Sequence, residues 1–194
     1  AMMTIARGIA LILTGGVSIY GFAQGFKWWG SGSIGALNPP ILLSLLIAAI
    51  GMVLLGRTLW GKYCLALGGN AEALRRTGVN TKAYLVSIYA VSGFCAAIAG
   101  LIMTARLNSA APLAGATYEM DAIAAVVLGG ASFKGGTGSV LGTLIASLTL
   151  SVMRNGLTLL AIPTYYQQVI TGTIILIAII MAEIRNRRER ETEA

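Results

Sequence analysis

One uncharged run of this chain, residues 83–105, strongly limits what the chain can fold into. It holds 23 consecutive residues without Asp, Glu, Lys or Arg. A helix rises about 1.5 Å per residue, so this run can cross a hydrocarbon core of about 30 Å. Charged residues make up 11% of the chain, whereas a soluble domain usually has about a quarter. We therefore expect an all-α, polytopic bundle of membrane helices.

Other apolar segments bring the expected number of crossings to about five. Residues 8–26 read as a membrane helix that breaks near Gly15, Gly16 and Gly21. The segments 41–55, continuing towards Trp60, 135–153 and 165–182 are each expected to be helical. Residues 122–133 are uncharged but too few to cross alone, so they predict a short or half helix sheltered by other helices.

The basic residues indicate which ends of these segments face the cytosol. If the segments alternate across the membrane and the C-terminal tail is cytosolic, ten basic residues fall inside and three outside, with Arg7 left aside. The excess inside is typical of membrane proteins. The net charge of +7 is then a topology signal rather than a nucleic-acid signal. The inner set is Arg57, Lys62, Arg75, Arg76, Lys82, Lys134, Arg185, Arg187, Arg188 and Arg190, and the outer set is Lys27, Arg106 and Arg154.

A small charged motif, "GGNAEALRRTGVNTKAY", interrupts the apolar segments on the expected cytosolic side. Asn70 is a suitable N-cap, and Glu72 lies in the first turn, where the helix dipole favours negative charge. Arg75 and Arg76 lie in the last turn, and Gly78 can take the left-handed conformation that ends a helix. The motif predicts a helix of about two turns, which is either a solvated connector or a docking element.

Two long stretches of the chain are "GKYCLALGGNAEALRRTGVNTKAYLVSIYAVSGFCAAIAGLI" and "GATYEMDAIAAVVLGGASFKGGTGSVLGTLIASLTLSVMRNGLTLL". They resemble the permeases of ribose-type sugar ABC importers, and the resemblance covers nearly all of the chain. The final "YYQQVITGTIILIAIIMAEIRNRR" resembles the last helix and basic tail of that family. "AMMTIARGIALILTGG" resembles one of its internal helices, so further helices are expected before it.

The resemblance implies a non-catalytic permease subunit of the bacterial inner membrane that needs no cofactor. It implies a second permease subunit, cytosolic ABC ATPase subunits that hydrolyse ATP, and an extracytoplasmic sugar-binding protein. Residues 1–184 would form one permease domain and residues 185–194 a basic cytosolic tail. The charged motif would be the coupling helix gripped by the ATPase, through Asn70, Glu72, Leu74, Arg75, Arg76 and Gly78.

Two glycine-containing motifs receive structural interpretations. "GRTLWGK" mimics a phosphate-binding loop, but Tyr63 stands where Ser or Thr should bind magnesium, and an apolar helix precedes it. "VLGGASFKGGTGS" predicts a tight cytosolic turn between close-packed helices, with Lys134 as a secondary contact for the ATPase. Gly138 and Gly142 are four residues apart and predict one packing face on a helix.

Two acidic residues near the short helix and one basic residue allow several interpretations. Glu119 and Asp121 could be a carboxylate pair of a hydrolase, but no other catalytic residues accompany them. Asp121 suits a helix cap. Arg154 can pair with Asp121 or Glu119, or lie at the membrane interface, which is the interpretation favoured here. Polar candidates for a sugar pathway are Ser87, Ser92, Thr104, Asn108 and Asn155.

Cys64 and Cys95 are the only cysteines and there is no His, which argues against a disulfide framework and a Cys/His metal site. Three other functions stay open. The first is an ABC permease for another solute, such as a branched-chain amino acid or a quorum-signal sugar derivative. The second is an ion-coupled secondary transporter, which would use intramembrane acids. The third is a membrane anchor without flux.

Overall fold

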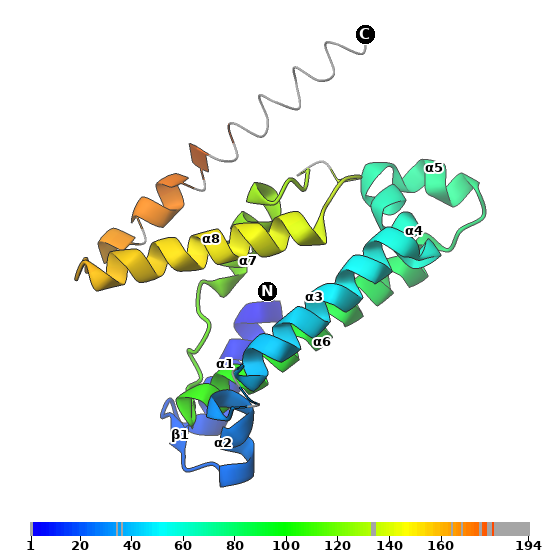
Figure 1. Cartoon of the computed structure of the whole chain (residues 1–194). Helices are drawn as coiled ribbons and strands as arrows, with labels where there is room; N and C mark the ends of the chain where they lie inside the picture. The colour runs from blue at the N-terminus through cyan, green and yellow to red at the C-terminus, as the bar shows by residue number, and fades with distance from the viewer. Residues whose placement is uncertain are drawn as a thin grey trace. The chain divides into compact units, whose positions relative to one another are not determined.

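The fold is helical, as predicted, with one pair of two-residue strands (Figure 1). The computed structural model describes residues 2–33, 35, 37–132, 135–163, 165–167, 169–174, 176–177 and 180. The elements are α1 (Met2–Thr14), β1 (Ile19–Tyr20), α2 (Gln24–Ser31), α3 (Pro39–Arg57), α4 (Leu59–Gly69), α5 (Ala71–Arg76), α6 (Thr81–Leu107), β2 (Ser109–Ala110), α7 (Tyr118–Leu128) and α8 (Val140–Leu159).

Three of the described helices are long and apolar enough to cross a membrane, namely α3, α6 and α8. α1 is apolar but has 13 residues. It ends where the sequence predicts a break, because Gly15 and Gly16 both have positive φ angles. The predicted segment 165–182 is helical at its described positions, and residues 181–194, including the basic tail, lie outside the described part.

Several helix boundaries differ from the predicted ones, and local contacts explain why. α3 ends at Arg57 rather than near Trp60, because the Thr58 side chain caps a new helix by accepting a hydrogen bond from the Gly61 backbone at 3.2 Å. A Cβ atom at Gly61 would overlap the backbone carbonyls of the preceding turn. The "GRTLWGK" motif is therefore a helix-to-helix corner.

The start and end of α8 also correct the sequence prediction. Helix was expected from Gly135, but Gly135 and Gly136 have φ angles of 81° and 85°, which belong to a turn. α8 begins after Ser139, whose hydroxyl accepts a hydrogen bond from the Gly142 backbone at 3.1 Å. It continues past the predicted end and includes Arg154. The turn predicted for the Gly-rich segment is thus present.

The chain divides into two compact units, and each is described by itself. The first consists of residues 1–49 and 85–117. In it, β1 and β2 pair antiparallel, with Ile19 opposite Ala110. α2 approaches the end of α6 so closely that a Cβ at Gly30 would overlap the Arg106 backbone. Trp28 and Trp29 of α2 are about half exposed, as suits aromatic side chains at a membrane interface.

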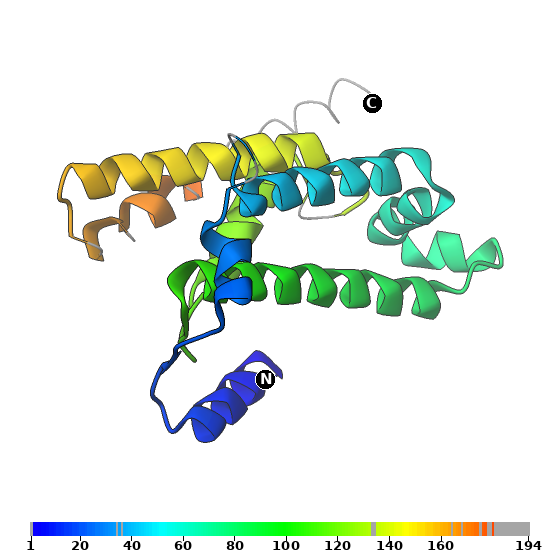
Figure 2. The same cartoon turned by 60° about the horizontal axis from the view of Figure 1, so that its bottom comes forward.

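The second unit consists of residues 50–84 and 118–194 and contains both candidate sites. α7 packs along α8, and α5 folds back beside α4 (Figures 1 and 2). The end of α7 approaches α8 so closely that a Cβ at Gly142 would overlap the carbonyl oxygen of Gly129. Gly138 lies before α8 rather than on it. This corrects the expectation that Gly138 and Gly142 share one helix face.

Cys64 and Cys95 are both free thiols. Cys64 lies in α4, and burial raises the pKa of its thiol. The thiol therefore stays protonated at neutral pH, which makes it a weak nucleophile.

Candidate functional site

The first candidate site is α5, whose ends are formed by the residues that the sequence assigns to them. Asn70 accepts a hydrogen bond from the Ala73 backbone at 2.9 Å through its side-chain oxygen. Thr77 donates its hydroxyl hydrogen bond to the Leu74 carbonyl at 2.7 Å. Gly78 has a φ angle of 84°. The Asn80 side chain accepts from the Ala83 backbone at 3.3 Å at the start of α6.

The polar side chains of α5 lie on the surface, whereas one apolar side chain holds the helix in place. Leu74 is 8% exposed. The Glu72 carboxylate lies 3.6 Å from Arg75 and 3.5 Å from Arg76, and all three side chains are more than half exposed. Exposed ion pairs of this kind contribute little to stability, typically about 0–1 kcal/mol. The three charges are thus available to a partner at little cost.

A close backbone contact ties the end of α4, just before α5, to the turn before α8. An added Cβ at Gly68 would lie 3.1 Å from the Gly136 nitrogen, and one at Gly135 would overlap the Gly68 carbonyl. Two glycine pairs thus allow the backbones to touch directly. Lys134, predicted as a secondary contact in this turn, lies outside the described residues.

The cap of α5 gives a direct prediction. We expect Asn70→Ala to destabilise α5 by about 1 kcal/mol, because the Ala73 amide loses its acceptor. Hydrogen exchange of the amides of residues 71–77 should become several-fold faster. Asn70→Asp keeps an acceptor oxygen and is the matched control. Equal exchange in Asn70→Ala and the native chain would show that the cap contributes nothing.

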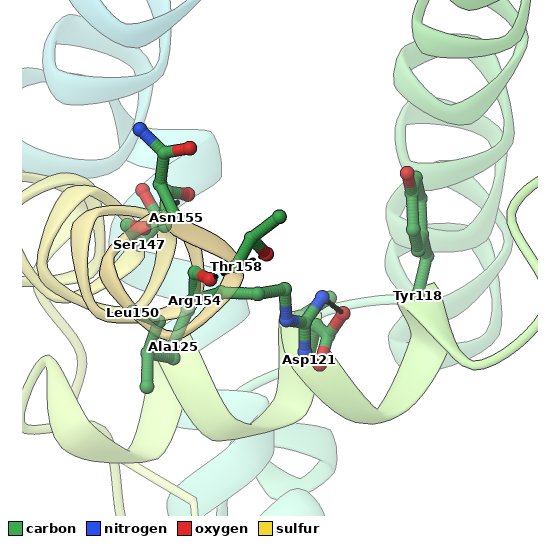
Figure 3. A pocket seen from close by; sticks show the side chains of 10 residues that line it. Tyr118, Asp121, Ala125, Ser147, Leu150, Arg154, Asn155 and Thr158 are labelled. Atoms are coloured by element: carbon green, nitrogen blue, oxygen red, sulfur yellow. Dashed lines mark hydrogen bonds and ion pairs between the residues drawn. The ribbon is translucent and has the colours of Figure 1, made fainter. Parts of the chain in front are cut away.

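The second candidate site is a pocket of about 540 Å³ between α7 and α8, a size within the range of about 300–1,000 Å³ usual for small-molecule sites. Figure 3 shows Asp121 of α7 and Arg154 of α8 facing each other. The two terminal nitrogens of Arg154 donate to the two carboxylate oxygens of Asp121 at 2.7 and 2.6 Å. The pair is not enclosed, since the side chains are 42% and 28% exposed.

This ion pair corrects two interpretations of the sequence. Arg154 binds Asp121, whereas the membrane interface was the favoured position. Asp121 lies three residues inside α7, which begins at Tyr118, so it is not the helix cap. The sequence offered this pair as one of its alternatives, because opposite charges in otherwise apolar helices are costly unless they meet. The packing of α7 on α8 selects Asp121 as the partner. Among the pathway candidates, Asn155 lines this pocket.

No described group of three or more His, Cys, Asp or Glu residues could hold a metal ion.

The two candidate sites differ in character. α5 is a rigid, charged surface element. The α7–α8 pocket has mostly apolar walls that also carry several hydroxyl groups and one ion pair, whose charges cancel.

Comparison with known proteins identifies transport permeases as relatives of this chain. The family described as "Branched-chain amino acid transport system / permease component" matches residues 1–179. The ribose import permease protein of Bacillus subtilis is 43% identical over 183 residues, which are 93% of this chain and 57% of the relative. The D-allose transport system permease of Escherichia coli is 38% identical over 175 residues, 90% of this chain and 54% of the relative.

A xylose transport system permease of Haemophilus influenzae is 41% identical over 140 residues, 72% of this chain and 37% of the relative. No solved structure matches the chain. The chain thus spans a little over half the length of the ribose and allose permeases that it matches.

Proposed function

This chain belongs to the family of branched-chain amino acid transport system permease components, and we propose that it is part of the membrane-spanning subunit of an ABC importer for a ribose-like monosaccharide. Its family and the three long apolar helices in the described part of the chain make it a multi-pass membrane protein. The observation that carries the proposal is the 43% identity to a ribose import permease over 93% of the chain.

The proposed mechanism is alternating access driven by ATP hydrolysis in a partner. α5 would fit a groove of a cytosolic ABC ATPase, with Glu72, Arg75 and Arg76 as its polar contacts. Movement of α5 would reach α8 through the glycine contact between residues 68–69 and 135–136. The subunit itself would catalyse no reaction. A second permease subunit and an extracytoplasmic sugar-binding protein would complete the importer in the bacterial cytoplasmic membrane.

The experiment that tests this function is an uptake assay with the full-length permease, its ATPase and its binding protein. We expect ribose uptake to continue when ATP is present and the ion gradients are collapsed. An ion-coupled secondary transporter would stop under these conditions. Loss of uptake with collapsed gradients, at unchanged ATP, would contradict the proposal.

Branched-chain amino acids are a second candidate cargo, because the description of the family names them. The relatives given above are named for ribose, allose and xylose, which favours a sugar. Excess unlabelled leucine separates the two candidates. It should leave ribose uptake unchanged if the importer is specific for sugars.

A further inference from the structure

α8 presents distinct faces, and one of them is polar along most of the helix. Residues three or four apart in a helix lie on the same face. Ser147, Ser151, Arg154 and Thr158 follow this spacing and all line the α7–α8 pocket. A separate face at the same spacing is apolar and exposed, through Leu141, Ile145, Leu148, Val152 and Leu159. In a helix that can cross a membrane, the second face suits lipid or another helix, and the first suits a polar pathway.

The hydroxyl groups of this polar face can still accept hydrogen bonds. Ser147 donates to the Leu144 carbonyl at 2.8 Å, and Ser151 donates to the Ser147 carbonyl at 2.8 Å. A hydroxyl has one hydrogen and two lone pairs, so each oxygen keeps acceptor capacity towards the pocket. The hydrogen bonds to the backbone thus fix both side chains and leave the lone pairs of each hydroxyl oxygen free to accept.

The ion pair adds donors and acceptors without adding net charge. Arg154 has five N–H donors and uses two of them on Asp121. The Asp121 carboxylate has further lone pairs, and both side chains are partly exposed at the pocket. A neutral molecule with several hydroxyl groups could bond to both without breaking the pair. The pair offers an ion no net charge.

We propose that the pocket between α7 and α8 lines the sugar pathway, with Ser147, Ser151, Asp121 and Arg154 forming transient hydrogen bonds to the sugar hydroxyls. This inference rests on the proposed function and names the surface that the cargo touches. A few exchangeable hydrogen bonds at an open surface suit a pathway, because a transporter must release what it admits.

The test compares two hydroxyl deletions on the same helix in the full-length permease, assembled with its ATPase and binding protein. Ser151→Ala removes a hydroxyl that lines the pocket. Thr149→Ala removes an exposed hydroxyl that does not line it and that also donates to the carbonyl four residues earlier, at 2.9 Å. Both changes therefore remove the same kind of side-chain-to-backbone hydrogen bond from α8, and Thr149→Ala removes a methyl group in addition. Ribose is the probe, and uptake per ATP hydrolysed is measured at saturating loaded binding protein.

We expect Ser151→Ala to lower ribose uptake per ATP about two- to tenfold, the equivalent of one hydrogen bond. Thr149→Ala should match the native chain. Asp121→Asn should lower uptake further, because Arg154 loses its charged partner. Should Asp121→Asn fail to assemble with the ATPase, the serine and threonine pair still decides the question.

Three outcomes would overturn the inference. If both alanine variants match the native chain, the pocket does not contact the sugar, and the Asp121–Arg154 pair only holds α7 and α8 together. If both lose uptake equally, the effect belongs to the helix and not to the pocket. If the native system takes up no ribose, the proposed function fails first, and the inference fails with it.

Discussion

Gly142→Ala should prevent α7 and α8 from packing, and we expect a loss of stability of about 3 kcal/mol. The new Cβ would overlap the carbonyl oxygen of Gly129. This contact is backbone and not the flexible end of a side chain, so the two helices must move apart. Overpacking costs about 1–3 kcal/mol or more. The measurement is the thermal midpoint of the purified full-length permease in detergent or nanodiscs, together with the yield of assembled protein.

Gly156→Ala provides a matched control on the same helix. An added Cβ at Gly156 meets no atom within 4 Å, and Ala is preferred to Gly inside a helix by about 1 kcal/mol. The control should leave the midpoint unchanged or raise it. Equal midpoints for Gly142→Ala and Gly156→Ala would show that the close approach of α7 and α8 does not exist.

Exchanging charges on α5 should uncouple ATP hydrolysis from uptake. The double variant Glu72→Arg with Arg76→Glu keeps the net charge and allows an ion pair within the helix, because the two positions already approach at 3.5 Å. A docked partner would nevertheless meet the wrong sign at both positions. Like charges across an interface cost several kcal/mol, so uptake should fall about tenfold or more.

The fold of α5 must be checked separately in this variant, because the exchange also opposes the helix dipole by about 0.3–1 kcal/mol at each end. Protection of the amides of residues 71–77 from hydrogen exchange reports on the helix itself. Asn70→Asp keeps the cap, so its amide protection should match that of the native chain. Normal uptake in the double variant would mean that these charges do not face the ATPase.

The local features of the fold could be predicted from the sequence where one residue decides the backbone. Asn70 and Gly78 set the limits of α5 because each has a conformational or hydrogen-bonding property that few residues share. The boundaries that were wrong depend on contacts instead. The uncharged run alone suggests a helix from Gly135, whereas the Gly-rich motif of residues 127–139 and the N-cap residue Ser139 favour a start after Ser139. The close backbone contact between Gly135 and Gly68 agrees with the second interpretation.

The two candidate sites also differ in how far they could be predicted from the sequence. α5 is local, so its residues and their roles as caps and surface charges could be assigned from the motif. The Asp121–Arg154 pair joins residues 33 positions apart. The charge pattern alone left three interpretations of Arg154 open, namely a pair with Asp121, a pair with Glu119 and a place at the membrane interface. Only the packing of α7 on α8 selects among them.

The most direct test of the central proposal measures ATP hydrolysis by the full-length permease with its candidate ATPase in nanodiscs. Hydrolysis is recorded with and without sugar-loaded binding protein, for the native chain and for Glu72→Arg. We predict that the loaded binding protein stimulates hydrolysis in the native complex and that the charge reversal abolishes this stimulation. An ATPase that never co-purifies with the permease, and whose hydrolysis ignores the sugar, would contradict the account.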